Sequence, residues 1–180
     1  LERVTFHQPL GDWLAVQATP PAGVFLTHLH LDHVLGLPDL AAETPVYVGP
    51  GETTASAAMH LFTRGTIDRT LEGKAVHELT FEERLGATGI AGVRDVFGDG
   101  SLYALWVPGH TPGSVAYLAR TTTGPVLLTG DVSHTRWGWD HDVEPGSFSE
   151  DADGSRETFH ALRAFARAHP ELEVRCGHQR

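Results

Sequence analysis

The stretch THLHLDHVLG, residues 27–36, places three histidines and one aspartate within six positions. The leucines and the valine of this stretch give the polar groups an apolar setting, where each buried polar group needs a hydrogen-bond or metal partner. His28 and His30 are two positions apart, so an extended or looped segment can point both at one metal ion. Asp32 and His33 diverge from that pair and can reach a second ion. Because each divalent ion takes roughly four to six donors, the sequence predicts further ligands elsewhere in the chain.

The residues on either side of this stretch predict two short strands. The first, GVFLTH (23–28), ends at the first histidine, and the second is PVYVG (45–49). The histidine cluster should therefore lie on a loop at the carboxyl end of a strand, where α/β proteins often place chemistry. Good helix formers and an early acidic residue predict a helix over GETTASAAMHLF (51–62).

The second half of the chain predicts a series of strands and one long helix. The Asp-Gly pair in GDG indicates a hairpin between the first two strands, and Ser155 is the expected helix cap. The helix carries an apolar stripe that should pack on a sheet. The predicted strands are 93–97, 102–107, 114–120, 125–130 and 172–176, and the predicted helix is 155–169. This order of elements predicts a layered α/β sandwich.

Length and composition restrict the classes of protein to consider. The 180 residues predict a single domain, 1–180, with a sizeable core. The formal net charge is −10, whereas a protein that binds nucleic acid usually carries an excess of basic residues. No apolar run reaches the 18 or so residues of a membrane span. We therefore expect a small-molecule substrate, with a homodimer as the assembly to consider.

The single cysteine, Cys176, excludes an internal disulfide framework and a thiolate zinc site. This fits a reducing compartment, so we expect a cytoplasmic location. The chain starts at Leu1, and LERVTFHQPL has neither the charged start nor the apolar stretch of a signal peptide. We therefore expect a fragment of a longer chain, with a removed leader as the alternative.

Three later residues are candidates for the missing ligands. His110, Asp131 and His178 each follow a predicted strand, in the turns PGHTPG, TGDVS and CGHQ. Carboxylate and imidazole donors of this kind suit zinc and related divalent ions.

The series HLHLDH, GHTPGS, LLTGD and GH, in this order from His28 to His178, resembles the metallo-β-lactamase superfamily of αββα metallohydrolases. The resemblance covers most of the chain and implies a four-layer αββα sandwich with a dinuclear metal site. It implies that one ion is bound by His28, His30 and His110, that the other is bound by Asp32, His33 and His178, and that Asp131 bridges both.

The resemblance also implies a reaction. Two divalent ions, zinc first and manganese, cobalt or iron as alternatives, would share a hydroxide that attacks the substrate. Asp32 or Asp131 would pass a proton to the leaving group. The sequence departs from the family at the start, because only 27 residues precede His28 and Asp12 is a weak substitute for the usual Asp-Thr-Gly-like turn. The N-terminal half of the fold is therefore expected to be shortened.

The region around His134 is the expected substrate side of the site. His134 lies three residues after Asp131 and is a candidate for substrate binding, with an ordinary loop histidine as the equal alternative. The aromatic stretch 134–148 has no periodicity and predicts a long loop over a pocket. Trp137 and Trp139 are expected to pack this loop onto the sheet, or otherwise to form an apolar wall.

The downstream motifs are most similar to lactonase-type enzymes that open acyl-homoserine lactones, although those usually carry a tyrosine near the position of His134. The leading hypothesis is hydrolysis of an ester, lactone or thioester, with hydroxyacylglutathione-type thioester hydrolases as the nearest rival. A zinc β-lactamase is disfavoured, because those enzymes generally carry other residues at the positions of His33 and Asp131. An iron-dependent oxidoreductase, similar to persulfide dioxygenases or di-iron oxygen reductases, and a non-catalytic metal-binding domain remain the alternatives from other classes.

Overall fold

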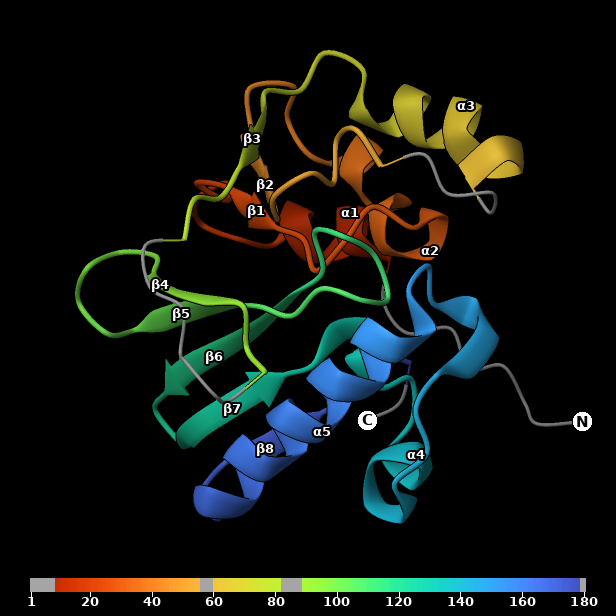
Figure 1. Cartoon of the computed structure of the whole chain (residues 1–180). Helices are drawn as coiled ribbons and strands as arrows, with labels where there is room; N and C mark the ends of the chain where they lie inside the picture. The colour runs from red at the N-terminus through yellow and green to blue at the C-terminus, as the bar shows by residue number, and fades with distance from the viewer. Residues whose placement is uncertain (1–8, 56–59, 82–88, 179–180) are drawn as a thin grey trace, which may run out of the picture.

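Two β-sheets form the centre of the protein, in a computed structural model that describes residues 9–55, 60–81 and 89–178 (Figure 1). The first sheet is parallel, in the order β1 (Val24–Phe25), β2 (Val46–Val48), β3 (Val76–Glu78). The second has the order β4 (Gly92–Asp95), β5 (Leu102–Trp106), β6 (Val115–Thr121), β7 (Gly124–Leu128), β8 (Glu173–Arg175). Its neighbours are antiparallel except for the parallel pair β7 and β8.

Helices cover the outer faces of both sheets (Figure 1). Three belong to the N-terminal half: α1 (Leu10–Ala15), α2 (Leu31–Val34) and α3 (His60–Leu71). Two belong to the C-terminal half: α4 (Arg136–His141) and α5 (Ala152–Ala168). Short 3-10 turns occur at Leu37–Asp39, Gly130–Val132 and Gly146–Phe148.

The alternation of side chains along the strands separates three apolar layers. In β2, Val46 and Val48 face the cluster beneath α2 and α3, whereas Tyr47 faces the other sheet. In β6, Val115 and Tyr117 point between the sheets while Ala116 joins the cluster under α5. This period of two lets each sheet bury both of its faces. The fold is therefore the expected αββα sandwich.

Direct hydrogen bonds join the two sheets close to the first histidine. The amide of Val115 donates to the Thr27 carbonyl over 2.8 Å, and the hydroxyl of Tyr117 donates to the Leu26 carbonyl over 2.9 Å. Burial raises the pKa of this tyrosine, so the hydroxyl stays protonated and remains a donor. The strand that leads into the histidine cluster is thus fixed to the second sheet.

Most strand predictions are confirmed. The hairpin expected from GDG is formed by β4 and β5, and the strands on either side of TTTG are β6 and β7. The segment HVLGLPDL (33–40) contains the end of α2 and a 3-10 turn before the next strand.

The prediction of a helix over 51–62 is wrong in its position. Residues 51–54 form turns, 56–59 lie outside the described residues, and α3 extends from His60 to Leu71. Gly51 has a φ of 77°, and Glu78 accepts the amide hydrogens of Gly51 and Thr53. These bonds to β3 hold the segment in turns that its helix propensity does not favour.

Helix α5 begins earlier than predicted. Asp151, not Ser155, caps it by accepting the amide hydrogen of Gly154 over 3.0 Å. Asp12 lies in α1 with an exposed side chain, so it takes no place in a strand-end turn. None of the helices within the described ranges is long and apolar enough to cross a membrane.

Candidate metal centre

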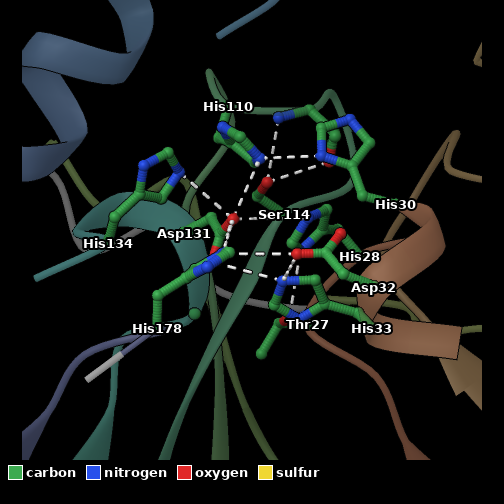
Figure 2. Close-up of polar contacts among 12 residues, drawn as sticks. Thr27, His28, His30, Asp32, His33, His110, Ser114, Asp131, His134 and His178 are labelled. Carbon is green, nitrogen blue, oxygen red and sulfur yellow. Dashed lines mark hydrogen bonds and ion pairs between the residues drawn. The ribbon is translucent and has the colours of Figure 1, made fainter. Parts of the chain in front are cut away.

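Four segments that are far apart in the sequence bring eight ligand-type side chains together at one edge of the two sheets (Figure 2). His28 follows β1, His30 lies immediately before α2, and Asp32 and His33 belong to α2. The other four lie beyond the carboxyl ends of β5, β7 and β8: His110, Asp131, His134 and His178. Each segment leaves a strand at this edge, which explains the meeting of distant motifs.

His28, His30 and His110 form a buried group, here called the inner triad. Their ligand nitrogens lie within 4.8 Å of one another, and His110 Nε2 is 3.0 Å from His30 Nδ1. The side chains of His28 and His110 are 1% and 2% exposed. The Thr27 hydroxyl lies 3.0 Å from His28 Nδ1, so His28 Nε2 is left to face the centre of the site.

Asp32, His33 and His178 form a second, more exposed group, here called the outer triad. Asp32 Oδ2 lies 3.5 Å from His33 Nε2 and 3.4 Å from His178 Nε2. Their side chains are 56%, 18% and 44% exposed, respectively. This group therefore faces solvent, in contrast to the inner triad.

Asp131 joins the two triads. Its carboxylate is 3.5 Å from His110 Nε2, 3.4 Å from His33 Nε2 and 3.1 Å from His178 Nε2, although the side chain is only 4% exposed. Burial by itself would raise the pKa of Asp131, but the contacts from His134 and His33 outweigh burial and hold the pKa far below its usual range. The carboxylate is therefore ionised in all ordinary conditions.

Two of the inner histidines, His28 and His110, are neutral at physiological pH. Burial, followed by the neighbouring histidines, lowers the pKa of His28 well below its usual value, and the same causes lower that of His110 to about 4. For His33, burial works in the same direction, but Asp131 outweighs it and raises the pKa. A neutral imidazole keeps the lone pair that a metal ion requires.

The donor set fits divalent metal ions. Donors about 2.0–2.1 Å from a tetrahedral zinc ion lie roughly 3.3 Å apart, and the contacts around Asp131 span 3.1–3.9 Å. His28 Nε2 is buried and, among the described residues, has no hydrogen-bond partner. A buried polar atom of this kind is expected to have a partner, which a bound ion would supply.

One buried residue near the site was not predicted from the sequence. Glu52 is 2% exposed and accepts hydrogen bonds from the Leu29 amide (2.7 Å), the Thr111 hydroxyl (2.8 Å) and the Gly113 amide (3.0 Å). It thus connects the segment carrying His28 and His30 to the turn carrying His110. Its donors are 23 to 61 positions away, so no local sequence pattern reveals the contact.

Glycines allow the ligand segments to approach one another closely. A Cβ atom at Gly177 would collide with the Asp131 carboxylate and lie 2.9 Å from the Gly130 carbonyl oxygen. Gly130 has a φ of 54°, and a Cβ atom there would collide with Thr27. The glycine before Asp131 and the glycine before His178 are therefore structural requirements of the site.

A cavity of about 330 Å³ opens onto the site between the two halves of the fold. Phe148, with 59% of its surface exposed, provides an apolar part of its wall. The other residues that line the cavity are His30, Asp32, His110, Asp131, His134 and His178. The site is thus accessible to a small molecule.

The prediction of an irregular loop over 134–148 is wrong, because the stretch contains α4 and a 3-10 turn. Thr135 caps α4 by accepting the Gly138 amide hydrogen, and Trp139 is buried in the core beside Phe159. Trp137 is 60% exposed and stacks on His141, away from the cavity. One tryptophan therefore packs the segment down as expected, and neither lines the cavity.

The structure places all seven predicted ligands and His134 around one centre. Asp131 is at the middle of the set, and the grouping of the other residues follows the two triads expected from sequence. The roles of these residues as ligands and as proton carriers remain predictions.

Comparisons with known proteins agree with this geometry. Residues 7–178 match the family described as the metallo-beta-lactamase superfamily. The metallo-hydrolase mfmC of Annulohypoxylon moriforme is 34% identical over 126 residues, which make up 67% of this chain and 33% of that protein. N-acyl homoserine lactonase AttM of Agrobacterium fabrum is 36% identical over 85 residues, 47% of this chain and 32% of that protein.

A solved structure supports the fold independently. The structure of a quorum-quenching N-acyl homoserine lactone hydrolase has a TM-score of 0.67 with 18% sequence identity, covering 92% of this chain and 62% of that chain. The chain thus spans about a third of the length of the two relatives named above and less than two thirds of this structural neighbour.

Proposed function

Because the chain belongs to the metallo-beta-lactamase superfamily, we propose that it is a metal-dependent hydrolase with a dinuclear site that cleaves an ester, lactone or thioester of a small molecule. One observation carries the proposal. Donors from four separate segments converge on the buried carboxylate of Asp131, with open space beside them. Structural requirements of the fold alone do not explain the burial of so many histidines around one anion.

His28, His30 and His110 would hold one ion, Asp32, His33 and His178 the other, and Asp131 would contact both. Two ions held in this way would supply Lewis acidity to a scissile carbonyl and a bound water of lowered pKa. Zinc is the ion that this mixture of imidazole and carboxylate donors suits best, with manganese, cobalt and iron as alternatives.

The two aspartates would have different roles. Asp131 is nearly inaccessible, so its carboxylate serves to hold the donor set together. Asp32 lines the cavity with 56% of its side chain exposed, where its carboxylate can take up a proton and deliver it to a leaving group. This difference in exposure favours Asp32 as the proton carrier.

Lactones are the first substrate class to test. The similarity to an N-acyl homoserine lactonase supports a cyclic ester, and the exposed ring of Phe148 at the cavity would bind an apolar acyl group. Esters and thioesters present the same carbonyl carbon to the same donors, so they belong in the same experiment.

A substrate panel tests this proposal. Acyl-homoserine lactones, aryl acetates and acyl-glutathione thioesters would be offered to the chelated protein and to the same protein after addition of zinc, manganese or iron. We expect turnover of at least one class that depends on added metal and is lost on chelation. Absence of metal-dependent hydrolysis across the panel would overturn the proposal, and redox activity with iron alone would favour the oxidoreductase alternative.

The proposal includes a cytoplasmic location and a homodimer. The single free cysteine, Cys176, is half-buried and fits a reducing compartment. Fractionation of the source cells and sedimentation analysis of the purified chain would check these two points.

A further inference from the structure

His134 points into the same centre as the seven predicted ligands, from the segment that carries Asp131 (Figure 2). Its Nε2 atom lies 3.2 Å from Asp131 Oδ2 and forms a group with His110 and Asp131 in which all ligand atoms lie within 4.8 Å. The ring centroid of His134 is 4.9 Å from that of His178 and 5.6 Å from that of His110. The imidazole is therefore surrounded by donors of both triads.

The short distance from His134 to Asp131 is not accompanied by hydrogen-bond alignment. His134 Nε2 is buried and, within the described part of the chain, has no hydrogen-bond partner. His28 Nε2 has the same property, whereas His178 Nε2 is hydrogen-bonded to Asp131 over 3.1 Å. His134 thus shares with a predicted ligand the feature that a bound ion would explain.

The backbone fixes His134 in this place. Its carbonyl accepts the His178 amide hydrogen over 2.9 Å, and the Ser133 carbonyl accepts that of Gly177 over 3.0 Å. These bonds pair the segment after β7 with the segment after β8, so the two histidines move together. A ligand held by a paired backbone is preorganised for metal binding.

We propose that His134 is an eighth metal ligand, which binds an ion together with His110 and Asp131. This inference rests on the proposed dinuclear site and deepens it. Its alternatives are that His134 contacts only the substrate or only orients Asp131. The distance of 3.2 Å between His134 Nε2 and Asp131 Oδ2 is close to the roughly 3.3 Å separation of two donors on one tetrahedral zinc ion.

The test compares His134→Phe with wild type and with His141→Phe, in which a histidine of the adjacent helix is lost. His141 stacks on Trp137 outside the cavity, so this control removes an imidazole of the same region without touching the site. Two quantities are measured on the full chain: the affinity and number of bound zinc ions, and the visible absorption spectrum after loading with cobalt.

We expect His134→Phe to bind one ion about tenfold or more weakly and to alter the cobalt spectrum, because a nitrogen donor is lost. His141→Phe should match wild type in both measurements. Unchanged affinity and spectrum in His134→Phe would overturn the proposal even if turnover falls, since a residue that touches only substrate would behave in that way.

The outcome also separates this inference from the proposed function. Wild type that binds two ions and hydrolyses substrate, with an unaltered metal site in His134→Phe, would refute only the role of His134. Wild type that binds no zinc and no cobalt would refute both. A His134→Gln variant, which retains polarity without an imidazole, should resemble His134→Phe if His134 is a ligand.

Discussion

The inner triad consists of three histidines and the outer triad of two histidines and an aspartate, and the two groups differ in their contact with solvent. His28 and His110 are almost completely buried, whereas Asp32 and His178 expose about half of their side chains. The inner triad is also held by Thr27 and Glu52. This contrast indicates that one ion would be held by a largely buried, preorganised set of ligands, while the other would be held by ligands that are more exposed to solvent.

Replacement of the shared carboxylate should have the largest effect. Asp131→Asn removes the buried negative charge that contacts histidines of both triads, an effect on the scale of about 3–5 kcal/mol for one buried charge partner. We expect a loss of affinity of more than about a hundredfold at both sites, measured by zinc titration. Loss of only one ion would mean that Asp131 belongs to one triad.

Gly177→Ala should have the second-largest effect on metal binding, because the added methyl group collides with Asp131. We expect reduced binding of the outer ion and a lower melting temperature of the zinc-loaded protein. Gly65→Ala in α3 is the matched control, since nothing lies within 4 Å of its Cβ position. Helix propensity predicts that this control gains about 0.5–1 kcal/mol of stability. Equal zinc affinity in Gly177→Ala and Gly65→Ala would contradict the claim that the site requires a glycine next to the Asp131 carboxylate.

Glu52→Gln should affect the inner triad selectively. The carboxylate of Glu52 accepts three hydrogen bonds through two oxygens. Glutamine has only one acceptor oxygen, because its amide nitrogen cannot accept hydrogen bonds, so at least one of the three donors loses its partner. We expect the inner ion to bind roughly 10- to 100-fold more weakly, with the outer ion nearly unchanged.

Glu78→Gln is the control for this experiment. Glu78 also binds the turn after β2 but contacts Gly51 and Thr53, at the exposed surface. Its replacement should leave zinc affinity unchanged. Equal weakening in both variants would mean that the turn, rather than the link made by Glu52, determines affinity.

The smallest expected effect is the pH dependence of the metal-free protein. His110 has a pKa of about 4 when folded, against 6.5 in an unfolded chain, so the unfolded state binds more protons between these values. Stability should therefore fall by about 2 kcal/mol from pH 7 to pH 5 on account of His110. His33, whose pKa is raised, works in the opposite direction.

Urea denaturation of the chelated protein at the two pH values would measure this difference. The His110→Gln variant should have a smaller decrease than wild type, because it lacks the buried imidazole. A wild-type stability that rises towards pH 5 would show that the protonation of His33 outweighs that of the inner triad.

The sequence predicted which residues meet at one centre, because each of the four motifs follows a strand. Once the strands form, the order of the motifs determines that His110, Asp131 and His178 meet the first cluster. The fold was predictable for the same reason: β-type runs with turn residues between them gave β4 to β7 nearly at their observed ends.

The failures have a common physical cause, which is long-range contact. The segment 51–54 has local helix signals, but Glu52 and Glu78 bind it to distant residues and hold it in turns. The first turn of α5 is capped by Asp151, whose amide also donates to the Gly109 carbonyl. Local propensity does not contain such contacts.

The central claim is that two ions are bound around Asp131 and that they differ in accessibility. The most direct measurement is stepwise removal of zinc from the fully loaded protein by a chelator, with metal content and hydrolysis followed together. We predict two zinc ions per chain, rapid loss of the first, slow loss of the second, and loss of hydrolysis with the first. A single ion, or release of both at one rate, would contradict the account.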